Sequence, residues 1–207
     1  IRDGKSLDGI SNLIHRDENG MVTIEKEASS ASIETLPTPD FRGLPMELYF
    51  SPEFIVPLSI TRGCYWGKCT FCTLHDVIGP GYRGRSIGKV ISDIRILQEK
   101  YGSKRFYFPI EDLPPNMVRK LPRAILNAGL EIEWWCDAKL EPEIFTPEVC
   151  AELSASGCKR LAFGYESASG RVLDLMNKGS QPNSAMDVIR RVSDAGISVT
   201  LYVMVGF

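Results

Sequence analysis

Apolar residues recur at two different spacings in the second part of the chain, and each spacing is typical of one kind of element. Short runs that are apolar throughout or alternate with polar residues predict strands, and apolar residues three or four positions apart predict helices. The predicted strands cover residues 57–63, 105–110, 130–137, 158–164 and 196–207, and the predicted helices cover residues 87–101, 115–128, 147–156 and 184–195. Strands that alternate with helices in this way indicate an α/β fold with a parallel sheet and right-handed crossovers.

The first part of the chain, residues 1–56, lacks this pattern. A short alternating run at residues 21–24 predicts a strand pair or an edge strand, and the Ser- and Pro-rich sequence after it suits an extended connector. We therefore expect residues 1–56 to lead into a main domain over residues 57–207. Because the last predicted strand is apolar and no helix follows to cover it, we also expect at least one more helix and strand after Phe207.

The composition is that of a folded domain with little net charge. Hydrophobic residues make up 43% of the 207 residues and charged residues 24%, and the formal net charge is −2. This balance excludes a disordered chain and provides no evident nucleic-acid-binding surface, since phosphate backbones are held by clustered positive charge. The longest apolar stretches have the length of strands, so no membrane span is predicted. No Gly-rich phosphate loop follows the first strand, which argues against a dinucleotide-binding or P-loop fold.

Three of the six cysteines crowd into nine residues, in the loop sequence TRGCYWGKCTFCTLH. Cys64, Cys69 and Cys72 have the spacing C-x4-C-x2-C, and three thiolates this close after a strand indicate a metal or cluster site. One alternative is a zinc knuckle with His75 as the fourth ligand. The other is a [4Fe–4S] cluster held by three thiolates, which leaves one iron open to a chelating ligand. The remaining cysteines are scattered and are expected to be buried thiols; they are Cys136, Cys150 and Cys158.

The cysteine loop resembles the signature of the radical S-adenosylmethionine (SAM) superfamily. Phe71 stands in the aromatic position before the last cysteine, and the gap from Cys69 to Cys72 matches that signature. The first gap is one residue longer than usual, and it resembles a variant found among cobalamin-linked members.

Other stretches resemble the same family in the same order, over residues 36–207. FGYESASGRVLDLMNKG resembles the end of the fourth strand and the helix after it, and DAGISVTLYVMVGF resembles the fifth strand. LPTPDFRGLPMELYF resembles the connector between a cobalamin-binding domain and the radical domain. The resemblance implies a partial (β/α)6 TIM-like barrel of parallel strands whose C-terminal part is missing. It also implies that residues 57–207 are a radical SAM core truncated after the fifth strand, and that residues 1–56 lead in from an upstream cobalamin-binding domain.

By this resemblance, Cys64, Cys69 and Cys72 hold a [4Fe–4S] cluster, and the amino and carboxylate groups of SAM chelate its fourth iron. Reductive cleavage of SAM then releases a 5′-deoxyadenosyl radical, so no catalytic residue is assigned on the protein itself. A low-potential electron donor of the flavodoxin or ferredoxin type is implied as a partner. The reducing chemistry implies a cytoplasmic setting.

Residues that follow the strands would supply the contacts to SAM. Glu111 and Asp112 follow the second strand and could accept hydrogen bonds from the SAM ammonium group, or else they cap the next helix. Glu166 follows the fourth strand and suits the ribose hydroxyls or the amino group, or else it caps the helix at Ser169. Lys178 would lie near the SAM carboxylate, or else it is a cation at a helix C-terminus.

Further residues are implied around the cofactor. Phe71 would pack beside adenine, and Gly206 would let the backbone approach adenine closely. Asp137 ends the third strand and could face SAM or the substrate. Trp134 and Trp135 precede it and point to opposite faces of the sheet, so one of them could line the barrel interior. For either side chain the core is the expected place.

The functional hypothesis is a cobalamin-associated radical SAM methyltransferase or a related radical modification enzyme. Its small-molecule or peptide substrate is not identified by the sequence. The alternatives are a methylthiotransferase-like RNA-modifying member of the family and a non-catalytic zinc-knuckle module. No Asp-x-His-x-x-Gly cobalamin motif occurs in the sequence, so cobalamin would be bound by a domain outside this chain.

Overall fold

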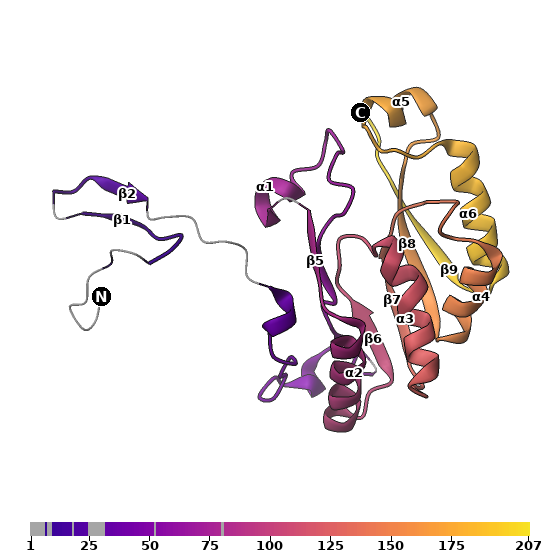
Figure 1. The fold of residues 1–207 in the computed structure, drawn as a ribbon, viewed down its shortest axis with the longest axis horizontal. Helices are drawn as coiled ribbons and strands as arrows, with labels where there is room; N and C mark the ends of the chain where they lie inside the picture. Colours follow the sequence, from indigo (N-terminus) through magenta and orange to yellow (C-terminus); the bar gives the residue numbers. More distant parts are fainter. Residues whose placement is uncertain (1–6, 8–9, 18, 25–31, 52, 80) are drawn as a thin grey trace. The chain divides into compact units, whose positions relative to one another are not determined.

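The structure is a computed structural model, and it describes residues 7, 10–17, 19–24, 32–51, 53–79 and 81–207. The chain divides into two compact units, residues 1–31 and residues 32–207. In the first unit, β1 (Ile14–Arg16) pairs antiparallel with β2 (Val22–Ile24) (Figure 1). The strand pair predicted from the alternating run is confirmed.

The second unit is built around a five-stranded parallel sheet with the strand order β3-β6-β7-β8-β9 (Figure 1). Its strands are β3 (Val56–Pro57), β6 (Arg105–Phe108), β7 (Glu133–Ala138), β8 (Cys158–Glu166) and β9 (Ser198–Val203). The helices that connect them are α2 (Ile87–Tyr101), α3 (Pro115–Asn127), α4 (Pro147–Ala155), α5 (Gly170–Leu175) and α6 (Pro182–Asp194). This arrangement confirms the predicted α/β class with a parallel sheet.

Capping side chains explain where two of the helices begin and end. Ser86 Oγ accepts a hydrogen bond from the Lys89 N–H at 3.2 Å, and Gly102 ends α2 in the left-handed region at a φ of 65°. Thr146 Oγ1 accepts from the Val149 N–H at 3.4 Å and opens α4 in the same way. Both helices therefore start at the N-cap that the sequence indicates.

Alternation along the strands separates two faces of the sheet. On β7, Trp134, Cys136 and Ala138 are buried, whereas Trp135 and Asp137 are half-buried on the opposite face. The prediction that the two tryptophans point to opposite sides is confirmed. Only one face of the sheet is thus filled by the main core, and the other is free to line a site.

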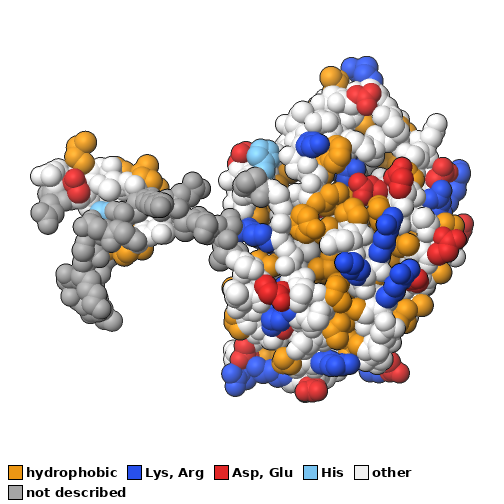
Figure 2. Space-filling model, in the orientation of Figure 1, with side chains coloured by type: hydrophobic (Ala, Val, Ile, Leu, Met, Phe, Trp, Pro, Cys, Tyr) orange, Lys and Arg blue, Asp and Glu red, His pale blue; other side chains and the backbone are white. Residues whose placement is uncertain are grey.

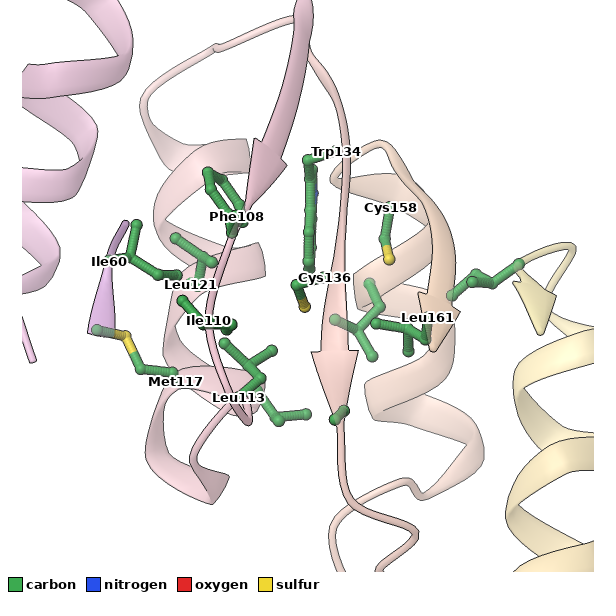
Figure 3. Close-up of a cluster of buried hydrophobic side chains, with 14 of the residues drawn as sticks. Ile60, Phe108, Ile110, Leu113, Met117, Leu121, Trp134, Cys136, Cys158 and Leu161 are labelled. Atoms are coloured by element: carbon green, nitrogen blue, oxygen red, sulfur yellow. The ribbon is translucent and has the colours of Figure 1, made fainter. Parts of the chain in front are cut away.

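The buried face packs against the helices and forms the core (Figure 3). The rings of Phe108 and Trp134 lie 5.6 Å apart between centroids, and Leu121 from α3 packs nearby. The Trp134 indole N–H donates to the Ser156 carbonyl at 3.1 Å, so its single polar atom is satisfied inside the core. Full burial of a side chain of this size contributes about 1.5–3 kcal/mol.

The first predicted strand, residues 57–63, overlaps β3 of the sheet only at Pro57 and is wrong after it. The structure instead has β4 (Thr61–Gly63) and β5 (Tyr82–Gly84) as a separate antiparallel ribbon. Gly63 has a φ of 90°, and a side chain there would collide with the carbonyl oxygen of Gly81. Its N–H donates to Glu111 Oε2 at 2.8 Å. The chain therefore turns out of the sheet just before the cysteine loop, held by a carboxylate that is distant in sequence.

Several short elements were not predicted. They are α1 (Leu74–Ile78), α5, and two turns of 3₁₀ helix at Ile33–Thr35 and Met46–Leu48. Each is shorter than two helical turns, so apolar spacing has no length over which to show a period.

Residues 32–56, the second part of the predicted lead-in, belong to the same compact unit as the sheet. Arg85 is 4% exposed at its side chain, and it donates to Asp93 Oδ2 at 2.7 Å and to a backbone carbonyl of this segment at 3.3 Å. The ring of Phe41 packs edge-on against Tyr101 at 5.5 Å between centroids. A buried ion pair and an aromatic contact therefore anchor the segment to α2.

The outer surface of this unit carries charges of both signs. On the face shown in Figure 2, Lys and Arg side chains are interspersed with Asp and Glu. At one edge of the sheet, β9 exposes apolar side chains such as Leu201 and Val203, and no described strand pairs with its outer edge. None of the helices in the described part of the chain is long and apolar enough to cross a membrane.

Candidate active site

A cavity of about 220 Å³ lies where the carboxyl ends of the parallel strands meet the cysteine loop. It is lined by eight of the nine predicted site residues, which are Cys64, Cys69, Phe71, Cys72, Glu111, Asp112, Glu166 and Lys178. Gly206 is not among the lining residues; it lies exposed after β9 at a φ of 84°. Parallel α/β enzymes build their sites at this edge of the sheet, because the loops that follow the strands converge there.

The three cysteines of the loop are free thiols, and each is half-buried. The Cys64 thiol donates to Asp112 Oδ2 at 3.8 Å. Cys69 and Lys178 line the same cavity. Burial raises the pKa of the Cys69 thiol, while the charge of Lys178 acts to lower it. The donor set of three thiols in one cavity fits an iron–sulfur cluster.

Within the described residues, no group of three or more His, Cys, Asp or Glu side chains could hold a single metal ion. A four-iron cluster does not need the sulfur atoms to meet at one point, since each thiolate binds a separate iron. His75, the fourth ligand of the zinc alternative, lies exposed on α1, with its Nε2 3.4 Å from a carboxylate oxygen of Asp76.

The two acids after β6 have different surroundings. Glu111 accepts from the Gly63 N–H at 2.8 Å and from Arg62 at 3.1 Å, so its carboxylate holds the start of the cysteine loop. Asp112 is buried, and its Oδ1 has no hydrogen-bond partner among the described residues. Burial, followed by the charge of Glu141, raises the pKa of Asp112 to about 7. An unpartnered carboxylate oxygen in the cavity wall fits a ligand that brings a hydrogen-bond donor.

Glu166 and Lys178 form a nearly buried ion pair, with 2.8 Å between Oε1 and Nζ. Glu166 lies at an irregularity of β8 and has a φ of 60°, an uncommon conformation for a residue with a side chain. A Cβ atom on Gly164 would lie 2.5 Å from Lys178 Nζ and 2.6 Å from Glu166 Oε1, so a larger residue there would displace the two side chains of the pair. The two side chains are joined to each other in the cavity wall, and neither acts as a helix cap.

Asp137, which the sequence also suggested could face SAM or the substrate, lines the cavity too. Three more side chains in the cavity wall, Trp66, Lys139 and Tyr202, were not assigned to the site from the sequence. Lys139 follows β7 and is 5% exposed at its side chain, Trp66 lies within the cysteine loop, and the Tyr202 hydroxyl donates to Asp137 Oδ2 at 3.3 Å. Lys139 and Tyr202 lie at strand ends, so the strand-end rule that selected Glu166 could have found them. Trp66 has no such signal, because its contacts are with a distant loop.

The scattered cysteines are buried structural thiols, as predicted. Cys136, Cys150 and Cys158 are each 2% exposed or less and are not part of the cavity wall. Burial raises the pKa of all three, to about 11 for Cys150, so they carry little thiolate at neutral pH.

The fold and the cavity define an α/β domain that gathers three thiols, acids and a lysine at the carboxyl ends of its strands. The family model described as the radical SAM superfamily matches residues 58–207. This chain belongs to the radical SAM superfamily, and the resemblance found in the sequence is confirmed.

Two curated relatives are methyltransferases. An uncharacterized methyltransferase of Pyrococcus horikoshii is 30% identical over 210 residues, which cover 99% of this chain and 44% of the relative. The bacteriochlorophyllide d C-12(1)-methyltransferase of Chlorobaculum tepidum is 28% identical over 193 residues, with coverages of 90% and 41%. The chain spans less than half the length of these relatives.

A solved structure shares the fold over the whole chain. It is the radical SAM methyltransferase TsrM of Kitasatospora setae, with cobalamin and a [4Fe–4S] cluster bound. The TM-score is 0.75 at 16% identity, and the match covers 100% of this chain and 44% of TsrM. At this identity the similarity establishes the fold, which includes the five-stranded sheet and the helices around it.

Proposed function

We propose that this chain is the cofactor-binding core of a cobalamin-associated radical SAM methyltransferase. The observation that carries the proposal is one cavity whose wall contains three free thiols, a buried carboxylate oxygen without a partner among the described residues, and the Glu166–Lys178 pair. A [4Fe–4S] cluster with SAM on its open iron supplies the one-electron chemistry when bound.

The cysteine loop holds the cluster in this proposal. Cys64, Cys69 and Cys72 provide one thiolate each, and Glu111 fixes the backbone that enters the loop through its bonds to residues 62 and 63. Because Glu111 accepts one hydrogen bond from the Gly63 backbone N–H and one from the Arg62 guanidinium, its contribution is to orient the thiols rather than to touch SAM.

The remaining residues bind the two ends of SAM. Asp112 Oδ1 accepts from the ammonium group, and Lys178 binds the carboxylate while Glu166 keeps its ammonium group in place. Phe71, in the cavity wall, packs beside the adenine. Gly206 lies outside the lining but precedes Phe207, whose ring centroid is 6.3 Å from that of Phe71, and it lets the backbone approach the adenine. These polar groups are held in a partly closed cavity, where charge pairs act more strongly than in water.

The names of the two relatives favour methyl transfer over the methylthiotransferase alternative. The family match favours a radical SAM enzyme over the zinc-knuckle alternative. Residues 1–56 then lead from a cobalamin-binding domain into the radical SAM core of residues 57–207, and the substrate is a small molecule or a peptide. A low-potential flavodoxin- or ferredoxin-type protein supplies the electron, in reducing surroundings such as the cytoplasm.

Anaerobic reconstitution with iron and sulfide tests the cofactor assignment. The wild-type chain is expected to turn brown, bind iron and sulfide in equal amounts, and consume SAM with a chemical reductant. Cys69→Ala should lose all three properties together, because one of three thiolates is removed. Cys150→Ala is the matched control, since that thiol is buried on α4 away from the cavity, and it should retain them.

Two results would contradict the proposal. One is a wild-type chain that takes up no iron and sulfide, and the other is a Cys69→Ala variant that keeps both the cluster and SAM consumption. The methyl-transfer part is tested in the complete gene product: methyl-labelled SAM should transfer label to added cobalamin, and absence of label in the cobalamin would remove that part alone.

A further inference from the structure

We propose that Trp66 is a positioning residue, and that its indole, seated on Gly179, couples the cysteine loop to the lysine of the Glu166–Lys178 pair. The inference rests on the proposed function, in which Lys178 binds the SAM carboxylate. It assigns a role to one of the four residues between the first two cysteines, a residue that the cofactor chemistry itself does not use.

Trp66 contacts the residues on both sides of Lys178. Its indole N–H donates to the Asn177 carbonyl at 2.9 Å. On the other side, its ring occupies the space that a side chain on Gly179 would need, so a Cβ atom there would collide with the indole. The ring and the lysine backbone therefore cannot move independently.

The backbone around Lys178 is shaped for this contact. Asn177 has a φ of 51° and Gly179 a φ of 68°, so the lysine lies between two left-handed residues. Asparagine and glycine are the residues that adopt this conformation most readily. The resulting turn directs one carbonyl to the indole N–H and presents a bare Cα to the ring.

A second attachment lies four residues further along the cysteine loop. The Thr70 N–H donates to the Met176 carbonyl at 2.9 Å, and the Thr70 hydroxyl donates to the Leu175 carbonyl at 3.0 Å. The cysteine loop is thus tied at two points to the segment that carries Lys178, and Cys69 lies between those points.

Lys139, which follows β7, contacts both the Trp66 ring and Gly179. Its Nζ lies 4.5 Å from the centroid of the Trp66 ring, within the range of a cation–π contact. The same ammonium group donates to the Gly179 carbonyl and to Glu141, each at 3.3 Å. A buried lysine needs such partners, and here they fix the indole and the glycine to the same strand end.

The consequence is that displacement of the indole displaces Lys178 from Glu166. The cluster ligands remain in the loop, so the cluster is expected to assemble, but SAM meets a misplaced cation. Substitution of a purely structural core residue would instead lower the free energy of unfolding without this selective loss of SAM affinity.

A double-mutant cycle between the ring and the glycine tests the coupling. In the wild-type background, Gly179→Ala should weaken SAM binding by about tenfold or more, because the new methyl group pushes the indole away. In a Trp66→Ala background, the same change should weaken binding by about threefold at most, since only the backbone strain of a left-handed alanine remains. SAM affinity is measured on the reconstituted protein by equilibrium dialysis, and the shift of the reduced-cluster EPR signal on adding SAM is recorded in parallel.

Gly196→Ala is the matched control. Gly196 has a φ of 79°, similar to that of Gly179, but a Cβ atom there meets nothing within 4 Å. It therefore introduces the same kind of backbone strain without a collision, and its SAM affinity and EPR shift should equal those of the wild type.

The outcomes separate the inference from the proposed function. A wild-type protein that binds neither cluster nor SAM overturns both. A wild-type protein that binds both, with equal effects of Gly179→Ala in the two backgrounds, overturns the positioning role alone. Should Gly179→Ala fail to fold, Trp66→Phe keeps the ring but removes the bond to Asn177: a severalfold loss of SAM affinity at unchanged iron content supports the role, and an unchanged affinity refutes it.

Discussion

At the scale of single residues, the candidate site depends on a few backbone positions with unusual geometry. Glu166 adopts a φ of 60° at the irregular end of β8, and this turn brings its carboxylate to Lys178. Gly164, two residues earlier, leaves the space that both side chains occupy. A conformation that costs free energy persists only where the surroundings stabilise it, and here the ion pair does so.

Replacing Glu166 tests that pair. Glu166→Ala should retain iron and sulfide but weaken SAM binding by about 1.5–3 kcal/mol, the loss of one charged hydrogen bond, because Lys178 loses the carboxylate that orients it. Equilibrium dialysis of SAM against the reconstituted variant measures this change. Glu99→Ala, at an exposed position of α2, is the control and should bind SAM like the wild type. Unchanged SAM affinity in Glu166→Ala would remove this residue from the site.

The site residues differ in how far the sequence could reveal them. The three loop cysteines are close in sequence, so their spacing alone indicates a cluster, and Glu166 and Lys178 were found by their place after a strand and by family resemblance. Trp66 was missed because its partner Asn177 is 111 residues away. No local pattern records which distant backbone a side chain will meet.

At the scale of helices and strands, elements with capping signals in their own sequence were predicted more accurately than elements shaped by distant contacts. The predicted helix at residues 87–101 matches α2 residue for residue, since Ser86 and Gly102 mark both ends. The predicted first strand fails after β3, because Glu111 binds the backbone of Gly63 and draws the chain out of the sheet. Elements bounded by their own capping residues were predictable, and those redirected by a distant side chain were not.

Two leucines on α3 provide a test of the core. Leu121 is fully buried beneath the sheet, whereas Leu126 on the same helix is 43% exposed. Leu121→Ala should lower the free energy of unfolding by about 2–5 kcal/mol, because the lost burial leaves a cavity. Leu126→Ala should lower it by about 1 kcal/mol or less, since its side chain is already partly in water. Urea unfolding followed by circular dichroism measures both, and equal effects would contradict the assigned packing of α3.

At the scale of the whole molecule, the segment of residues 32–56 is held against α2 by hydrogen bonds to buried charged groups as well as by aromatic contacts. Asp93 is fully buried on α2 and receives hydrogen bonds from Arg85, from Lys89 and from Thr38 of the preceding segment. The carboxylate therefore connects three separate parts of the second unit. Removal of one partner from such a buried group leaves a charge inside the protein that is no longer paired, which is strongly destabilising.

The expected effect of removing this carboxylate is large. Asp93→Ala should lower the free energy of unfolding by about 3–5 kcal/mol, because the Arg85 guanidinium stays buried without its partner. Asp187→Ala removes one half of an exposed pair with Arg190, 3.7 Å apart on α6, and should change stability by about 1 kcal/mol or less. Thermal and urea unfolding of the two variants compare these effects. A small effect of Asp93→Ala would mean that the segment is held mainly by its aromatic contacts.

The exposed outer edge of β9 has a consequence for self-association of this chain in solution. Among the strands that the structure describes, none pairs with the outer edge of β9, and exposed Leu201 and Val203 flank it, so this edge is a template onto which a further strand can add. In a preparation of these 207 residues by themselves, this edge should favour self-association as the protein concentration rises, which light scattering measures. Lysine in place of Val203, on the rim of the sheet, should keep the molecules apart.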